Sequence, residues 1–136
     1  MRIVLDTNVL ISGIFFSGPP FEILKAWRNG EVQIVSSPEI LYEYYRAANL
    51  LQKQFPNTDI EPIFNMIAIN SELIRAPALH EQVCDDPDDD KFLACAIASN
   101  TRVIVSGDKH LLKLSGYKGI TIAKPAQFVD EYLNEK

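Results

Sequence analysis

The chain has 136 residues, of which 47% are hydrophobic and 23% are charged, as expected for a single globular domain. It contains no run of about 18 apolar residues, so we expect no transmembrane helix, and its N-terminus lacks the layout of a signal peptide. The two cysteines, Cys84 and Cys95, form no Cys-x-x-Cys motif. We therefore predict one domain over residues 1–136, with reduced thiols, in the cytoplasm.

The net charge of −5 is unlike the basic surface that nucleic-acid-binding proteins usually carry. Most of this charge is local, because residues 85–90 read Asp-Asp-Pro-Asp-Asp-Asp and hold five acidic side chains. Without those five acids the net charge would be zero. A nucleic-acid substrate is therefore not excluded, since a bound cation would offset the acidic run.

Short runs rich in isoleucine and valine alternate along the chain with segments of helical periodicity. The short runs are apolar on both faces and predict buried parallel strands. In chain order the predicted elements are a strand at 2–5, a helix at 20–29, a strand at 32–35, a helix from 37 to 50 or 51, a helix at 59–69, a weak strand at 73–75, a helix at 89–100, strands at 102–105 and 119–122, and a helix at 125–133. This alternation predicts an α/β fold in which helices cover both faces of a parallel sheet, with the active site beyond the carboxyl ends of the strands.

Two acids follow predicted strands directly. Asp6 comes after the first strand, and Asp108 comes after the strand at 102–105 and the pair Ser106-Gly107. Both are therefore expected at the edge of the sheet where a site would lie. The alternative is that each only caps the segment that follows it.

Glu43 lies within a predicted amphipathic helix. Ile40, Tyr44 and Ala47 share one face of that helix. Glu43 follows Ile40 by three residues and precedes Ala47 by four, so it lies on or beside this face. An unpaired carboxylate on an inward face is costly, which indicates a function for Glu43. The alternative is a glutamate at the edge of the stripe that points to water or pairs with Arg46.

The acidic run offers several candidates for one further site residue. At helical spacing, Asp89 lies on the same face as Phe92 and Leu93, and Asp90 lies about 100° further round. We therefore predict that Asp89 faces inward, with Asp90 as the second choice. Asp86 precedes the helix and is a natural cap or a supporting ligand.

These four acids, Asp6, Glu43, Asp89 and Asp108, are predicted to meet at one rim of the sheet. Gathered carboxylates repel one another, and a divalent cation removes that cost. All-oxygen ligands select hard ions such as Mg²⁺ or Mn²⁺, and the absence of Cys/His spacing argues against zinc. Such an ion suits the hydrolysis of phosphodiester bonds.

Four segments of the chain, taken together, resemble the PIN-domain nucleases. They are residues 3–10 (IVLDTNVL), 37–43 (SPEILYE), 86–94 (DPDDDKFLA) and 103–108 (VIVSGD). Residues 17–20 (SGPP) and the leucine pair at 111–112 are similar to the VapC-like branch, the toxins of toxin–antitoxin pairs. The resemblance spans nearly the whole chain.

The resemblance implies a three-layer PIN-like fold with a five-stranded parallel sheet, and an endoribonuclease that cleaves single-stranded RNA with Mg²⁺ or Mn²⁺. It also implies a homodimer and a partner antitoxin. The residues it assigns are four catalytic metal ligands, Asp6, Glu43, Asp89 and Asp108, and two groups that orient them, Asn8 and Ser106. Because the run contains three consecutive aspartates, the resemblance leaves the third ligand open between Asp89 and Asp90.

Two other functions fit parts of the sequence. A PIN-like domain could bind RNA or protein without cutting, although a missing acid would then be expected. A signalling receiver domain also has five strands with acids at strand ends. A receiver needs a phospho-accepting aspartate after its third strand, and this chain has Arg75-Ala76-Pro77 there.

Overall fold

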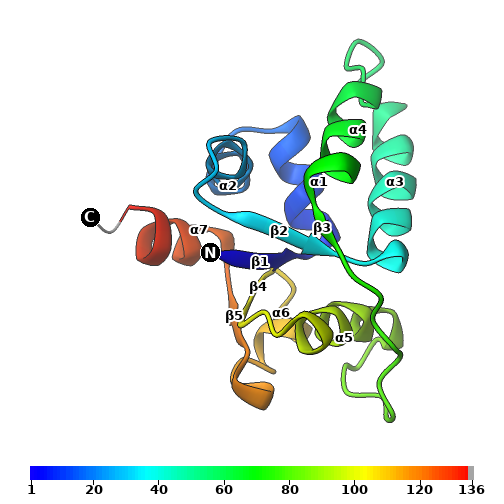
Figure 1. The fold of residues 1–136 in the computed structure, drawn as a ribbon. Coiled ribbons are helices and arrows are strands. Elements are labelled where there is room, and N and C mark those ends of the chain that lie inside the picture. Colours follow the sequence, from blue (N-terminus) through cyan, green and yellow to red (C-terminus); the bar gives the residue numbers. More distant parts are fainter. Residues whose placement is uncertain (135–136) are drawn as a thin grey trace.

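The computed structural model describes residues 1–134, which fold into a five-stranded parallel sheet with helices on both faces (Figure 1). The elements in chain order are β1 (Arg2–Leu5), α1 (Thr7–Phe15), α2 (Pro19–Arg28), β2 (Gln33–Ser36), α3 (Pro38–Gln52), α4 (Glu61–Asn70), β3 (Glu72–Leu73), the 3₁₀ turn η1 (Pro87–Asp89), α5 (Asp90–Ser99), β4 (Val103–Val105), α6 (Lys109–Leu112), the 3₁₀ turn η2 (Tyr117–Gly119), β5 (Thr121–Ala123), α7 (Pro125–Phe128) and the π-helical turn η3 (Val129–Leu133).

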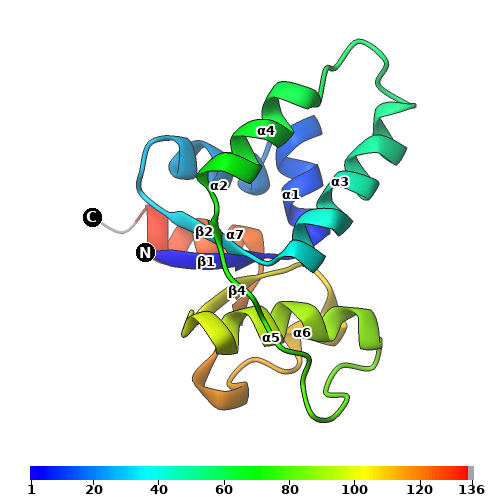
Figure 2. The same cartoon turned by 45° about the vertical axis from the view of Figure 1, so that its right-hand side comes forward.

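The strand order is β3-β2-β1-β4-β5, and every neighbouring pair is parallel. The predicted α/β class and five-stranded parallel sheet are therefore confirmed. In Figures 1 and 2, α1 to α4 lie on one side of the sheet and α5 and α6 on the other, which makes three layers. Receiver domains have the order 2-1-3-4-5, so the strand order shows that the receiver alternative is wrong.

The central strand β1 is buried on both sides. Ile3, Val4 and Leu5 are each 0% exposed, as the apolar run predicts for a strand with helices on both faces. Leu5 pairs with Val105 of β4, so the two strands end together. This register places the residues that follow β1 and β4 side by side at the carboxyl edge.

Several predicted boundaries differ from the structure. The last strand begins at Thr121 rather than 119, because Gly119 has a φ of 78° and closes the turn η2, a conformation that a strand does not accept. The weak strand is Glu72–Leu73, two residues long. The predicted helix at 89–100 corresponds to the end of the turn η1 followed by α5, and Asn100 ends it in the left-handed region with a φ of 57°.

Residues 7–15, where no helix is predicted from the sequence, form α1 in the structure. The buried residues of α1 are Thr7, Val9, Leu10, Ile11 and Gly13. They lie on several sides of the helix, because α1 is packed between the sheet and the helices α2 and α3. A helix that is apolar on several sides lacks the single stripe by which an amphipathic helix is recognised.

Tyr44 joins α3 to the end of β1. Its side chain is fully buried, and its hydroxyl donates a hydrogen bond to the carbonyl oxygen of Leu5 at 2.5 Å. A buried phenol needs such a partner. The bond fixes the neighbouring residue Glu43 close to the segment that follows β1.

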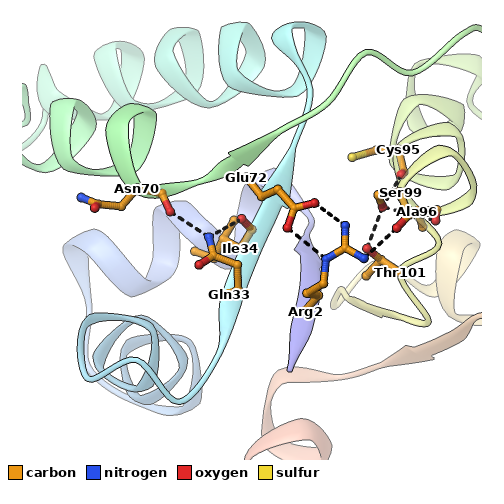
Figure 3. Close-up of polar contacts among 9 residues, drawn as sticks. All are labelled: Arg2, Gln33, Ile34, Asn70, Glu72, Cys95, Ala96, Ser99 and Thr101. Atoms are coloured by element: carbon orange, nitrogen blue, oxygen red, sulfur yellow. Dashed lines mark hydrogen bonds and ion pairs between the residues drawn. The ribbon is translucent and has the colours of Figure 1, made fainter.

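The opposite, amino-terminal edge of the sheet is held by Arg2 (Figure 3). Its guanidinium forms an ion pair with Glu72 of β3 and donates a hydrogen bond to the carbonyl oxygen of Ser99 at 2.7 Å. That carbonyl belongs to the last residue of α5, where helical carbonyls lack intrahelical partners. The hydroxyls of Ser99 and Thr101 lie 2.6 Å apart. Arg2 thus ties an edge strand and a helix end to the central strand.

Neither cysteine is in a disulfide, as expected, and both are buried. Burial raises the pKa of Cys84, and it raises the pKa of Cys95 to about 12, so both thiols stay protonated at neutral pH. Among the described residues no single helix is long and apolar enough to cross a membrane. Only α1 and α2 taken together would be, and they are bent by 87°.

We expect Gly13→Ala to destabilise the protein, because a Cβ at this position of α1 would lie 2.7 Å from Leu24 Cδ1 and 2.8 Å from the backbone oxygen of Pro20. Overpacking of this kind costs about 1–3 kcal/mol, measurable as a lower thermal midpoint. Gly107→Ala is the matched control, since a Cβ there meets nothing within 4 Å. Equal midpoints for the two variants would contradict the close approach of α1 and α2.

Candidate active site

Asp6 directly follows β1 and is 6% exposed. It occupies the position before α1, yet its side chain makes no capping hydrogen bond to that helix. Its Oδ2 instead accepts a hydrogen bond from the Ser106 hydroxyl at 2.6 Å. The simple capping alternative is therefore wrong for Asp6, whose carboxylate is held across the ends of β1 and β4.

Ser106 connects the two strand ends. It follows β4, is fully buried, and accepts a hydrogen bond from the backbone N–H of Asp108 at 3.0 Å while its own hydroxyl donates to Asp6. Asp108 caps the short helix α6, because its Oδ1 accepts from the N–H of His110 at 2.8 Å. Asp108 therefore caps α6 and also lies near Asp6. Burial raises the pKa of Asp6, and the charge of Asp108 adds to the rise.

Glu43 reaches the same edge from α3. One carboxylate oxygen accepts a hydrogen bond from the Thr7 hydroxyl, and the other lies 2.5 Å from the ammonium nitrogen of Lys91 in α5. Glu43 is partly buried. It therefore does not point freely into water, and its ionic partner is Lys91 rather than Arg46.

Asp89 is the last residue of η1 and directly precedes α5. Its pKa is raised from 3.8 to about 6, first by burial and then by the charges of Asp6, Asp108, Asp86 and Glu43. Coulomb interactions decline with distance, so this carboxyl lies within reach of the other three predicted site acids. The structure thus brings Asp6, Glu43, Asp89 and Asp108 to one edge.

Asp90 faces away from these acids. Its carboxylate accepts hydrogen bonds from the N–H of Cys84 at 2.7 Å and of Val83 at 3.1 Å. Burial would raise the pKa of Asp90, but these hydrogen bonds outweigh it and lower the pKa. Asp86 caps the turn η1 by accepting from the N–H of Asp88 at 3.0 Å. Asp90 therefore anchors the loop before α5, and Asp86 has the capping role that the sequence allowed.

The electrostatics of the cluster disfavour four free carboxylates. Burial raises the pKa of Asp6 despite the Ser106 hydrogen bond, and the charges of Asp108 and Glu43 add to the rise. Like charges gathered in a partly buried site are costly. The cost is removed by protonation or by a cation, and Lys91 already supplies one positive charge at Glu43.

Two contacts in the site were not anticipated from the sequence, those of Thr7 and Lys91. Both lie inside the resembling segments, directly after Asp6 and Asp90, but nothing in the spacing showed that they would meet at Glu43. Asn8 is exposed, and no hydrogen bond from its side chain to the four acids occurs within residues 1–134. Its orienting role stays a prediction, whereas Ser106 contacts both strand-end acids.

The donor set suits a hard divalent ion, because it consists of carboxylate oxygens alone. In the arrangement described for residues 1–134, no three or more His, Cys, Asp or Glu side chains are set to hold one ion. Glu43 contacts Thr7 through one carboxylate oxygen and Lys91 through the other. The residues fit such an ion in kind and charge.

Comparisons with known proteins agree with the fold. A family model described as the PIN domain matches residues 2–110. An uncharacterised protein of Methanocaldococcus jannaschii is 28% identical over 143 aligned positions, which cover 97% of this chain and 92% of that protein. The structure of VapBC2 from Rickettsia felis, bound to a DNA fragment from their promoter, superposes with a TM-score of 0.56 at 15% identity. The superposition covers 91% of this chain and 98% of that one.

The raised pKa of Asp89 predicts that the metal-free protein loses stability as the pH rises. The folded-state pKa of about 6 exceeds the ordinary value of 3.8, so this stabilisation is complete below about pH 4 and is lost as the pH passes 6. After allowance for solvent screening we expect a loss of about 1 kcal/mol.

Thermal midpoints of the wild type at pH 5 and pH 7.5, measured in chelator, test this prediction. Asp89→Asn should reduce the difference between the two midpoints. Asp88→Asn, an exposed neighbour, should leave it unchanged, and an unaltered profile in both variants would contradict the placement of Asp89.

Asp90→Ala should destabilise the protein at every pH near neutral, because it leaves the backbone N–H groups of Val83 and Cys84 without their acceptor. The expected loss is about 1–3 kcal/mol, seen in denaturant unfolding at pH 7.5. Asp89→Asn, by contrast, should raise metal-free stability at that pH. If Asp90→Ala raised the stability and Asp89→Asn lowered it, Asp89 rather than Asp90 would be the residue that anchors the loop.

Proposed function

The chain belongs to the PIN-domain family, and from this premise we propose that it is a ribonuclease that hydrolyses phosphodiester bonds of single-stranded RNA with Mg²⁺ or Mn²⁺. The observation that carries the proposal is the arrangement at the carboxyl edge, where Ser106 bonds both to the Asp6 carboxylate and to the backbone of Asp108 and Thr7 bonds to Glu43. Burial and the charges of these acids raise the pKa of Asp89. Acids from two strand ends and two different helical segments converge there. A structural role does not account for that convergence, since gathered like charges lower stability.

In this proposal Asp6, Glu43, Asp89 and Asp108 hold the ion. The chemistry that a divalent ion supplies is activation of the phosphate ester and of the attacking water. The chain's own hydroxyls orient two of the ligands, because Ser106 donates to Asp6 and Thr7 donates to Glu43. Such outer partners fix the direction of a ligand and commonly matter almost as much as the ligand itself.

A cavity of about 420 Å³ lies between residues 76–82 and the starts of α3 and α5, and it reaches the four acids only through Lys91, the partner of Glu43. Its lining includes Ser37 and Glu39 at the start of α3, together with Pro87, Asp90 and Lys91 near the start of α5. It therefore opens between the two helices that supply Glu43 and the acidic run.

We further propose that the protein is the toxin of a toxin–antitoxin pair, works in the cytoplasm and forms a homodimer. The fold likeness to the VapBC2 structure supports an antitoxin partner. Large apolar side chains on the outer face of α3 support protein contacts, since Tyr42 is 64% and Leu50 62% exposed. The buried, protonated thiols suit a reducing compartment.

The ion pair between Lys91 and Glu43 gives weight to one alternative, a PIN domain that binds RNA without cleaving it. In that case the ammonium would stay on Glu43 permanently and no divalent ion would enter. RNA would bind equally well with and without Mn²⁺, and no cleavage would occur at any metal concentration.

The test compares the wild type with Asp6→Asn, Glu43→Gln and Asp89→Asn in cleavage of single-stranded RNA with Mn²⁺. We expect each to lose at least about a hundredfold in rate, because each removes one charged ligand, while circular dichroism shows a retained fold. Asp88→Asn is the control and should keep wild-type activity. Mn²⁺ should also raise the thermal midpoint of the wild type. Full activity in all three variants would disprove the site.

A further inference from the structure

Lys91 is the cation that contacts the four-acid cluster in the described part of the chain. It is the second residue of α5, and its ammonium nitrogen lies 2.5 Å from Glu43 Oε1. The side chains of Lys91 and Glu43 are 22% and 32% exposed, so the pair is partly withdrawn from water. The other ion pairs of residues 1–134 join Arg2 to Glu72, and His110 and Lys113 to Asp85, and involve none of the four acids.

The position of Lys91 follows from the segment that carries it. Asp90 fixes the start of α5 through its hydrogen bonds to Val83 and Cys84, and Phe92 is fully buried in the core. Lys91 is held between these two anchors, on the side of α5 that approaches α3. Its contact with Glu43 is therefore set by backbone placement rather than by chance meeting of two flexible surface side chains, which is the usual state of exposed pairs.

A divalent ion and this ammonium compete for the same carboxylate oxygen. Glu43 Oε2 accepts from Thr7 and Oε1 lies against Lys91, so an ion bound through Oε1 would share that oxygen with the ammonium group. Two cations against one oxygen repel each other strongly in a partly buried site. The ammonium group of Lys91 therefore opposes the binding of an ion at Glu43 Oε1.

We infer that Lys91 is a built-in counter-ion, which holds Glu43 in place in the metal-free protein and gives up Glu43 Oε1 to the divalent ion. This inference rests on the proposed function, because it presupposes that the cluster binds such an ion. Lys91 is a positioning residue in this role. In the metal-free protein, Lys91 reduces the electrostatic repulsion among the four carboxylates. It also lowers the affinity for the ion, because part of the binding free energy is used to displace Lys91 from Glu43.

The experiment measures Mn²⁺ binding by calorimetry and the thermal midpoint in chelator, for the full chain and the variants Lys91→Met and Lys91→Arg. Lys91→Met keeps the unbranched apolar stem and removes the charge. We expect it to bind Mn²⁺ about tenfold more tightly, which equals about 1.4 kcal/mol, and to melt at a lower temperature than the wild type in chelator. Lys91→Arg, which keeps the charge, should retain affinity and a midpoint close to the wild type.

Lys113→Met is the matched control, since Lys113 pairs with Asp85 at 2.5 Å outside the cluster, and it should leave Mn²⁺ affinity unchanged. Wild-type affinity in Lys91→Met would overturn the inference, and so would weaker binding, which would make Lys91 a support of the ion site. If Lys91→Met does not fold, Lys91→Gln replaces it with the same expected results. Absence of Mn²⁺ binding by the wild type would instead overturn the proposed function, and this inference with it.

Discussion

Mutual repulsion of carboxylates at the carboxyl edge of the sheet is the constraint on which the rest of this structure depends. A domain is stable by only about 5–15 kcal/mol, and several partly buried like charges use a substantial part of that margin. Burial and neighbouring charges raise the pKa of both Asp6 and Asp89. The surrounding structure has to supply rigid positions, hydrogen bonds and positive charge to keep the acids together.

The scaffold meets this requirement with a buried central strand and a small number of hydroxyl groups. Ser106 joins the ends of β1 and β4 through Asp6 and the backbone of Asp108. The Tyr44 hydroxyl fixes α3 against the last residue of β1, which brings Glu43 within reach of Thr7. The stabilising network around Arg2 lies at the other edge of the sheet (Figure 3), so rigidity is supplied without adding charge to the site.

The aspartates of the acidic run before α5 have different structural roles. Asp85 pairs with Lys113, Asp86 caps the turn η1, Asp89 faces the cluster, and Asp90 holds the loop at Val83 and Cys84. The negative net charge therefore has local causes. It is compatible with the proposed action on RNA because the acids that meet at the site are those that a divalent ion would neutralise.

The sequence by itself determined the alternation of strands and helices, the parallel sheet and the strand-end positions of Asp6 and Asp108, because hydrophobic periodicity and local turn residues decide those features. It also favoured Asp89 over Asp90 from helical geometry. In the structure Asp90 accepts hydrogen bonds from Val83 and Cys84, whereas burial and the charges of the other site acids raise the pKa of Asp89. The sequence did not reveal α1, since a helix buried on several sides has no stripe. Only the tertiary structure brought Thr7 and Lys91 to Glu43. These contacts join residues far apart along the chain, and the local sequence pattern does not predict which helix faces pack together in the folded protein.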